Sequence, residues 1–211
     1  MRLLELFSGT GSIGKEFRKL GWHVVSVDLD PEAGADICKS VLDLSAGEVG
    51  HVDLIWASPP CTEYSIARTN AKRPRNYDGA DALVRKVLDL ADELNVMYFF
   101  ENPYSGYLKS RPVVADLDYR VVDYCKYAGP DFPHHGRKRT AIWTNTGWIP
   151  SRVLCKKDCG YCVGNCHVDI AQRGGRTGCR GHSLNELFAM PPELCADIAA
   201  YSTRLIETLN V

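Results

Sequence analysis

Short apolar runs typical of buried strands alternate along this chain with segments of helical periodicity. The strand-like runs cover residues 3–7, 23–27, 52–57, 96–100, 119–124 and 139–144. Helices are expected over residues 12–20, over residues 81–95 after a turn at residues 77–79, and from Pro191 to about Leu209. Strands that alternate with helices in this way are joined by right-handed crossovers. The pattern therefore predicts an α/β fold, with a mostly parallel sheet and helices on both of its faces.

Composition divides the chain into three parts. Residues 1–148 carry the alternating pattern and are long enough to bury a core. Residues 149–184 are rich in Cys, Gly and basic side chains and poor in long apolar ones, so they need a staple such as a metal ion. Residues 185–211 contain the final helix, which we expect to pack back on the first part.

The near-zero net charge argues against a wholly basic nucleic-acid coat protein. The 211 residues carry a formal net charge of −1, and the basic stretches at residues 66–76 and 172–182 contain no acid. Such stretches are either solvated surface or local patches for nucleic acid. The chain has no apolar run of about 18 residues, and its first residues begin a strand rather than a signal peptide. We therefore expect an intracellular monomer without a membrane partner, cytoplasmic if the source is prokaryotic or a phage.

A single cysteine follows two prolines at the predicted carboxyl end of a strand. Cys61 lies in the octet SPPCTEYS, directly after the apolar run at residues 52–57. A lone cysteine is more often a buried structural residue. In open α/β folds, however, ligands bind at the carboxyl ends of strands, and proline stiffens the backbone there. Cys61 is therefore the candidate nucleophile.

A glycine-rich turn follows the first predicted strand. The segment ELFSGTGSIG places Phe7, Gly9 and Gly11 between this strand and the first helix. Glycine lets a ligand approach the backbone, whose N–H groups point at it. Asp28, at the end of the second strand, can accept hydrogen bonds from a ribose, and Asp43 can accept one from an adenine amino group. A tight structural turn is the alternative, whereas a nucleotide-phosphate loop is disfavoured because no Gly-Lys-Ser/Thr follows.

Two further segments carry charged side chains near predicted strand ends. Glu101 follows the apolar run at residues 96–100, where partial burial would raise the pKa of its carboxyl and keep a proton on it near neutrality. Arg137 and Arg139, two residues apart at a strand start, point to the same side and can hold a base oxygen and a phosphate. The alternatives are an acid that caps a loop and a solvated basic turn.

Taken in order, these segments resemble the motifs of the cytosine 5-methyltransferases. The matching motifs are Phe7-x-Gly9-x-Gly11, Pro60-Cys61, Glu101-Asn102, Arg137-x-Arg139 and, more weakly, Ala189-Met190-Pro191-Pro192. The resemblance, which covers about residues 1–145 and 185–211, implies a Rossmann-like methyltransferase fold, and the Cys-rich segment would add a small zinc-stapled insert to it. It also implies S-adenosylmethionine as the methyl donor. The cofactor-binding residues would be Phe7, Gly9, Gly11, Asp28, Asp43 and Pro60.

The same resemblance implies a mechanism on DNA. The Cys61 thiolate would add to carbon 6 of cytosine, and Glu101 would donate a hydrogen bond or a proton to nitrogen 3. Arg139 would hold the exocyclic oxygen, with Arg137 near a phosphate or the thiolate. Carbon 5 would then take the methyl group, and Cys61 would leave. The target base must be flipped out or unpaired, and the basic loop at residues 66–76 is placed to close over it.

The chain departs from the family pattern at several positions. These are Thr62 in place of the usual glutamine, Pro103 in place of valine, His135 in place of glutamine, and Leu187-Phe188 in place of Gly-Asn. No long target-recognition domain lies between Arg139 and Pro191. Two alternatives therefore stay open: an RNA cytosine 5-methyltransferase, and a nucleic-acid-binding module without turnover.

Cysteines concentrate in the second part of the chain. Their spacing is Cys155-x3-Cys159-x2-Cys162-x3-Cys166-His167, followed by Cys179 and His182. In an intracellular protein this spacing favours a closed structural zinc site over disulfides or free thiols. The expected ligands are Cys155, Cys159, Cys162 and His167, with Cys166 or Cys179 able to replace His167. The zinc would shape residues 174–176 as a small nucleic-acid surface. Cys38, Cys125 and Cys195 lie in or beside apolar segments and are expected in the core.

Overall fold

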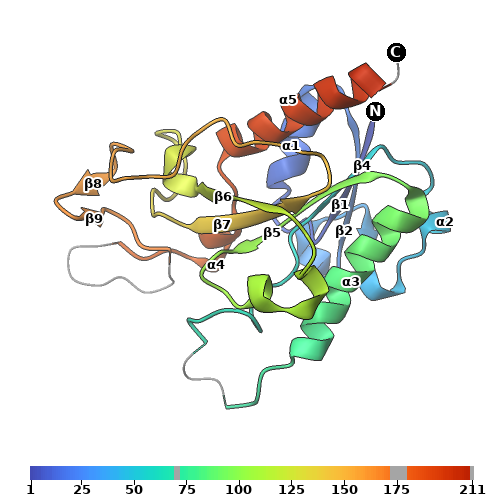
Figure 1. The fold of residues 1–211 in the computed structure, drawn as a ribbon, viewed down its shortest axis with the longest axis horizontal. Helices are drawn as coiled ribbons and strands as arrows, with labels where there is room; N and C mark the ends of the chain where they lie inside the picture. The colour runs from blue at the N-terminus through green and yellow to red at the C-terminus, as the bar shows by residue number, and fades with distance from the viewer. Residues whose placement is uncertain (69–71, 172–179, 210–211) are drawn as a thin grey trace.

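A seven-stranded, mostly parallel sheet forms the centre of the computed structural model, which describes residues 1–68, 72–171 and 180–209 (Figure 1). The strands are β1 (Arg2–Leu6), β2 (His23–Asp28), β3 (Ile37–Cys38), β4 (Leu54–Ala57), β5 (Met97–Pro103), β6 (Tyr119–Asp123) and β7 (Arg139–Thr144). Their order across the sheet is β3-β2-β1-β4-β5-β7-β6, and β7 is antiparallel to both of its neighbours. The predicted α/β fold is confirmed, and each strand expected from the sequence is present.

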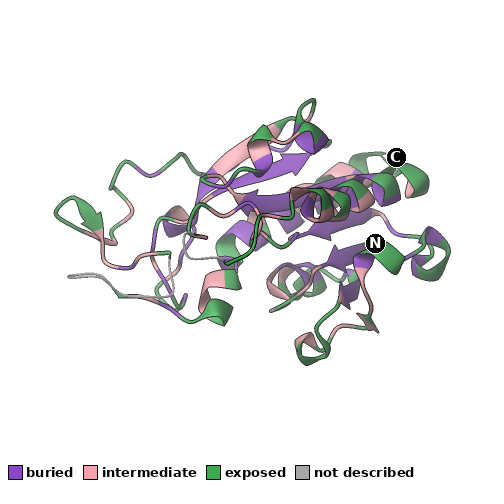
Figure 2. Ribbon diagram, turned by 90° about the horizontal axis from the view of Figure 1, so that it is seen from below, coloured by how far each residue is buried: buried purple, intermediate pink, exposed green. Residues whose placement is uncertain are grey.

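Helices cover both faces of this sheet (Figures 1 and 2). The helices α1 (Ser12–Lys19) and α5 (Pro192–Leu209) pack together on one face, and α3 (Tyr77–Leu94) covers the other with the short α2 (Ala46–Val49). Successive strand residues point to opposite faces, so Leu3 packs on the α1–α5 side and Leu4 on the α3 side. Both leucines are fully buried, and each such burial contributes about 1.5–3 kcal/mol.

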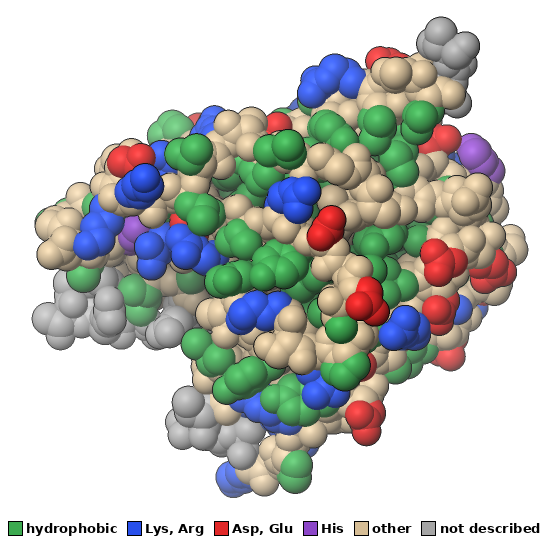
Figure 3. Space-filling view, in the orientation of Figure 1, with side chains coloured by type: hydrophobic (Ala, Val, Ile, Leu, Met, Phe, Trp, Pro, Cys, Tyr) green, Lys and Arg blue, Asp and Glu red, His purple; other side chains and the backbone are tan. Residues whose placement is uncertain are grey.

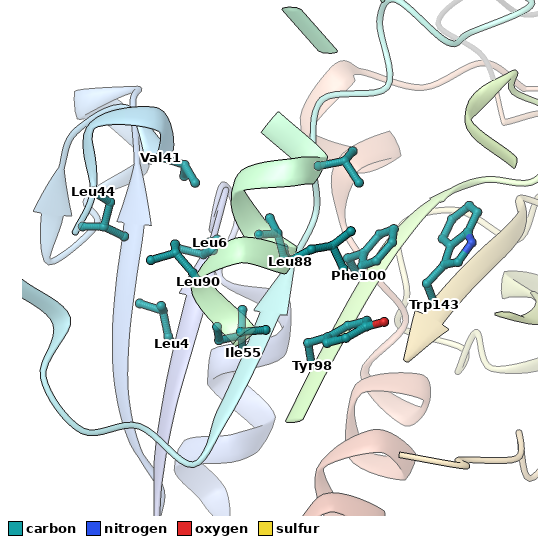
Figure 4. Close-up of a cluster of buried hydrophobic side chains, with 14 of the residues drawn as sticks. Leu4, Leu6, Val41, Leu44, Ile55, Leu88, Leu90, Tyr98, Phe100 and Trp143 are labelled. Atoms are coloured by element: carbon teal, nitrogen blue, oxygen red, sulfur yellow. The ribbon is translucent and has the colours of Figure 1, made fainter. Parts of the chain in front are cut away.

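The core on the α3 side continues across to the antiparallel strand β7. Figure 4 shows Leu4 and Ile55 from the parallel strands, Leu90 from α3, and Phe100 and Trp143 from β5 and β7 in one cluster. Phe100 and Trp143 are cross-strand partners, and their rings stack with centroids 5.0 Å apart and planes 5° from parallel. Cross-strand aromatic pairs of this kind stabilise a sheet, and this one holds β7 in register beside β5.

The helix α3 begins earlier than the sequence signal suggests. Residues 77–79 were expected to form a turn before it, but the helix starts at Tyr77. The reason is a cap: the Asn76 side chain accepts a hydrogen bond from the N–H of Gly79. Asp78 lies in the first turn, where a negative charge favours the helix dipole.

The strand β5 runs further than the apolar run that predicts it. It continues past residue 100 to Pro103, because its last residues pair with β7 and Glu101 lies opposite Ile142. The parallel neighbour β4 stops at Ala57, opposite Phe100. Glu101 therefore lies inside a strand, just beyond the end of β4, rather than in a loop.

The Cys-rich segment forms little regular structure. Its described elements are the hairpin of β8 (Cys162–Val163) and β9 (Cys166–His167), followed by α4 (Leu184–Phe188). A capping box between Ser183 and Glu186 starts α4. The short 3₁₀ helices cover Pro31–Ala33, Val41–Asp43, Leu108–Ser110, Pro112–Val114 and Tyr124–Lys126. Within the described residues, no helix has the length and apolar character needed to cross a membrane.

The packing of α1 on β1 makes Gly14 intolerant of a side chain. A Cβ at Gly14 would lie 2.4 Å from Oε2 of Glu5 and 3.1 Å from Val24. We expect Gly14→Ala to lower the free energy of unfolding by about 1–3 kcal/mol. Gly47→Ala is the matched control, because no atom lies within 4 Å of the added Cβ, and it should raise this free energy by about 0.4–1 kcal/mol. Urea unfolding measures both changes, and equal stabilities of the two variants would contradict the packing.

Candidate active site

One cleft runs along the carboxyl ends of the parallel strands. It has a volume of about 740 Å³ and is lined from the β1–α1 turn, the end of β2, the segment after β4, and β5. The strand order changes direction between β1 and β4, and open α/β sheets bind ligands at this point. The volume is within the range of small-molecule sites. Gly9, Cys61 and Glu101 all line this cleft, so the structure brings together three motifs that are far apart in sequence.

The glycine-rich turn forms one wall of the cleft. Its backbone is left-handed at Phe7, Gly9 and Gly11, with φ values of 55°, 46° and 64°. Glycine adopts a positive φ easily, whereas this conformation costs about 1–3 kcal/mol at a bulky residue such as Phe7. Asp28 holds the turn, because its Oδ2 accepts a hydrogen bond of 2.8 Å from the N–H of Gly9. Phe7, Gly9 and Asp28 thus present a shaped wall to a ligand.

The other predicted cofactor residues lie in different positions. Pro60 lines the cleft, whereas Gly11 and Asp43 lie outside its lining. Gly11 is the N-cap of α1. Asp43 is exposed at the end of a 3₁₀ helix, and it is Ser40 and Val41 of this segment that line the cleft.

The C-terminal part of the chain adds a further wall. Asn185, Phe188 and Met190 line the cleft, and the N–H of Met190 donates a hydrogen bond of 3.2 Å to Oγ of Ser12. Phe188 is 58% exposed. An exposed aromatic ring at a cleft offers a stacking surface for a planar base.

The segment that carries Cys61 is fastened to β5. The carbonyl of Pro59 accepts a buried hydrogen bond of 2.9 Å from Nδ2 of Asn102. The carbonyl of Cys61 accepts hydrogen bonds from the N–H groups of Tyr64 and Ser65, so the chain turns directly after the cysteine. Cys61 itself stays partly exposed. These bonds hold the thiol in the cleft.

Burial and neighbouring charge together set the ionisation of Glu101 and Cys61. Glu101 is 9% exposed, and burial raises the pKa of its carboxyl. The charge of Lys138 and a hydrogen bond with Ser58 lower this pKa, but burial is the larger effect. Burial also raises the pKa of the Cys61 thiol, the charge of Glu101 raises it further, and Lys138 lowers it. A protonated Glu101 can donate a hydrogen bond and no longer repels a thiolate at Cys61.

The sequence motifs do not single out Lys138, yet it lines the cleft. Its ammonium donates a hydrogen bond of 2.8 Å to the carbonyl of Leu187 and lies 4.9 Å from the centre of the Tyr124 ring. Strand alternation is the signal that could have found it. If Arg137 and Arg139 point to one side at the start of β7, the residue between them points to the other.

The two arginines of this motif lie outside the cleft lining. Arg137 is exposed. Arg139 pairs across β6 and β7 with Asp123, whose carboxylate accepts hydrogen bonds of 2.8 Å from Nε and from Nη2. The Asp123 side chain is fully buried, and a bidentate pair fixes the plane of the guanidinium.

Glu5 is a second acid in the cleft that no motif indicates. It lies on β1, is 2% exposed, and burial raises the pKa of its carboxyl to about 7. Its Oε1 accepts a hydrogen bond of 3.1 Å from the N–H of Gly14. The sequence signal that could have found Glu5 is an acidic residue within an otherwise apolar strand. The charge of Glu5 therefore changes near neutral pH.

The basic loop after Cys61 is bonded to its own neighbours. Arg68 and Arg73 form ion pairs with Glu63. Arg75 donates to the carbonyls of Glu63 and Ser65. These bonds link the loop to the segment that carries Cys61, and residues 69–71 of the loop lie outside the described residues.

Cysteine and histidine side chains come together beside β6. The ligand atoms of Cys125, Cys155, Cys159 and His167 all lie within 4.8 Å of one another. Three of these residues are among the ligands that the sequence spacing predicts. The fourth, Cys125, is 1% exposed, in agreement with the expected core position, and Cys195 is buried as well. The same expectation for Cys38 is wrong, because Cys38 is exposed on the short strand β3 at the end of the sheet. This cluster could bind a metal ion.

The remaining cysteines of the segment lie outside this group. Cys162 Sγ is 3.9 Å from Cys159 Sγ, but it is not within 4.8 Å of every ligand atom of the cluster. Cys166 is exposed. Cys179 and the proposed surface at residues 174–176 lie outside the described part of the chain.

Comparison with known proteins connects the chain to methyltransferases. It is 30% identical over 221 residues to a protein of Frog virus 3 (isolate Goorha) named "Probable DNA (cytosine-5)-methyltransferase", which covers 94% of this chain and 98% of the viral protein. Among solved structures, the Entamoeba histolytica methyltransferase EhMeth matches with a TM-score of 0.51 and 14% identity, over 68% of this chain and 52% of that chain. A Spodoptera frugiperda DNMT2 mutant matches with a TM-score of 0.45 and 16% identity, over 72% of this chain and 53% of that chain. The chain thus spans about half the length of these solved structures. No protein-family model matches it.

The position of Lys138 predicts how the reactivity of Cys61 depends on pH. Lys138→Met removes the charge that favours the thiolate, so the pKa of Cys61 should rise further above its usual value. The thiolate then forms only at higher pH, and we expect the pH profile of Cys61 alkylation to move up by about 1 unit. Lys138→Arg keeps the charge and should keep the profile. Peptide mass spectrometry measures the alkylation of Cys61, and an unmoved profile in Lys138→Met would rule out this role for Lys138.

Proposed function

The chain belongs to the DNA (cytosine-5)-methyltransferase family, and we propose that it transfers a methyl group from S-adenosylmethionine to carbon 5 of cytosine in DNA. The observation that carries this proposal is the single cleft that holds Cys61 and Glu101 together with the glycine-rich turn and Asp28. A nucleophile, a buried acid and a wall suited to a nucleoside are the groups that this reaction needs.

The cleft fits S-adenosylmethionine. Asp28 offers a carboxylate to ribose hydroxyls, the turn at Gly9 exposes backbone without a side chain, and the same cavity reaches Cys61. We propose that Phe7, Gly9, Asp28 and Pro60 hold the cofactor, while the role of Asp43 remains a prediction from the sequence. The bound cofactor supplies an electrophilic methyl carbon.

The protein's own residues make cytosine reactive. The Cys61 thiolate adds to carbon 6 and forms an Sγ–C6 bond, while Glu101 gives a proton to nitrogen 3, so that electron density moves to carbon 5. Carbon 5 would then take the methyl group, whose bond to the sulfonium sulfur breaks and leaves S-adenosylhomocysteine, and carbon 5 would lose its hydrogen as a proton to solvent. The Sγ–C6 bond breaks, which restores the ring double bond and the thiolate, and nitrogen 3 returns its proton.

Positive side chains support the charges that develop. Lys138 favours the thiolate of Cys61. Arg139 and Arg137 lie outside the cleft lining, and Asp123 fixes the guanidinium plane of Arg139. Their assignment to the exocyclic oxygen of the base and to a backbone phosphate therefore remains a prediction from the sequence.

The charge distribution suits a DNA backbone. Lys and Arg side chains gather over the part of the molecule that carries β8 and β9 (Figure 3). Exposed basic residues in and beside this segment are Arg137, Arg152, Lys156 and Lys157. Such a surface attracts phosphates, and the target base must flip out or be unpaired to reach Cys61 in the cleft.

We assign a structural zinc ion to the Cys/His cluster. Cys155, Cys159 and His167 supply thiolate and imidazole ligands, which zinc prefers. Four protein ligands leave no open position for a substrate, so the ion would have a folding role. It would hold residues 149–184 against a catalytic domain of residues 1–148. Residues 185–211 would pack back on that domain.

A DNA duplex that contains 5-fluorocytosine tests the chemistry. With S-adenosylmethionine present, carbon 5 of the adduct carries both the methyl group and fluorine, and fluorine cannot leave as a proton does. The Cys61 adduct should therefore persist and retard the protein in denaturing electrophoresis. Cys61→Ser should give no adduct, and Glu101→Gln should form it about 10²–10⁴-fold more slowly. Cys38→Ser, which changes an exposed cysteine, is the control and should behave as wild type. An adduct in Cys61→Ser would exclude the mechanism.

Matched DNA and RNA oligonucleotides of one sequence decide the substrate. With S-adenosylmethionine present, we expect transfer of a labelled methyl group to DNA. Transfer to RNA alone would assign the chain to RNA cytosine methylation, and transfer to neither would leave a binding module without turnover.

A further inference from the structure

The Cys/His cluster is built from two parts of the chain that are far apart in sequence. Cys155, Cys159 and His167 come from the Cys-rich segment, whereas Cys125 lies in the 3₁₀ helix directly after β6 of the central sheet. Cys125 is 1% exposed. A ligand at this position would tie the segment to the sheet.

The distances in the cluster match tetrahedral zinc. Bond lengths of about 2.3 Å to sulfur and 2.0–2.1 Å to nitrogen place sulfur and nitrogen ligands about 3.6 Å apart. The His167 Nε2 atom lies 3.5 Å from Cys155 Sγ and 3.4 Å from Cys159 Sγ. Cys125 Sγ is within 4.8 Å of all the other ligand atoms, and Cys162 Sγ is not.

A backbone bond to sulfur points independently to a metal thiolate. The N–H of Lys157 donates to Cys155 Sγ at 3.3 Å, and Lys157 has a positive φ of 70°. A non-glycine residue rarely adopts this backbone conformation. Hydrogen bonds to ligating atoms are a common feature of metal sites, since they orient the ligands.

The cluster is also connected to the proposed active site. Asp123 lies two residues before Cys125, and its Oδ2 accepts hydrogen bonds from Nη2 of Arg139 at 2.8 Å and from the N–H of Cys155 at 2.9 Å. The Asp123 side chain is fully buried. One carboxylate oxygen therefore joins a cluster residue to an arginine of the catalytic motif.

We infer that Cys125, rather than Cys162, completes a zinc site with Cys155, Cys159 and His167, and that this ion clamps the Cys-rich segment to the sheet and fixes Arg139 through Asp123. The inference rests on the zinc assigned above, but it does not depend on methyl transfer. Asp123 is a positioning residue in this arrangement, because it acts on substrate only through Arg139.

Zinc content of the full-length chain tests the ligand set. Cys125→Ser, Cys162→Ser and Cys166→Ser are purified with zinc, dialysed against a chelator and measured by elemental mass spectrometry. We expect one zinc per chain in wild type, Cys162→Ser and Cys166→Ser, and at least a tenfold loss in Cys125→Ser. Retention by Cys125→Ser together with loss in Cys162→Ser would overturn the inference.

Alkylation of the wild-type protein with and without zinc also tests the ligand set, and it does not require Cys125→Ser to fold. Zinc should protect Cys155 and Cys159, whereas Cys162 should react equally fast with and without zinc. Protection of Cys162 by zinc would refute the assignment of Cys125.

Hydrogen exchange tests the connection to Arg139. Removal of zinc should speed exchange at residues 137–141, while exchange in β1 stays unchanged. If residues 137–141 exchange at the same rate in both forms, the clamp does not reach Arg139. These readouts involve no methylation, so failure of the proposed enzyme activity would leave them unaffected.

Discussion

The unequal lengths of two neighbouring strands create the candidate active site. β4 ends at Ala57, while β5 continues beside the antiparallel β7 to Pro103. The last residues of β5 therefore have no parallel strand beside them, and the chain that leaves β4 turns there. Asn102 fastens this turn through the carbonyl of Pro59. Cys61 and Glu101 line one cleft because of this difference in strand length.

Burial sets the charge state of this cleft. It raises the pKa of both Glu5 and Glu101, so these acids hold protons at higher pH than exposed carboxyls do. An ionised carboxylate at Glu101 repels a thiolate at Cys61 and raises the pKa of the thiol. A proton on Glu101 removes this repulsion. Lys138 then provides the positive charge that favours the thiolate. The cleft thereby combines an acid able to donate a proton with a thiol able to lose one.

The Cys-rich segment lies in the chain between β7 and the final helix α5. It contains little regular structure, and one of its contacts with the rest of the fold is the hydrogen bond from Cys155 to Asp123. This buried carboxylate pairs with Arg139 and also accepts a hydrogen bond from Cys155. A segment too short to form its own core can in this way become a rigid part of the molecule.

Local patterns in the sequence determined most of the elements. The strands and the long helices follow from side-chain periods of two and 3.6 residues, which depend on near neighbours only. Motif order likewise identified Cys61 and Glu101, which the structure places in one cleft. The start of α3 at Tyr77 depended on a side-chain cap by Asn76, which lies just outside the apolar pattern.

Contacts between distant segments decided the rest. The insertion of β7 between β5 and β6, and with it the extension of β5 to Pro103, depends on pairing across about 40 residues of chain. The same pairing turns Lys138 into the cleft and Arg139 onto Asp123. Cys125 joins Cys155 only because β6 and the Cys-rich segment meet in space. The sequence determined which residues can do chemistry, and the tertiary structure decided which of them meet, because nonlocal pairing sets their distances.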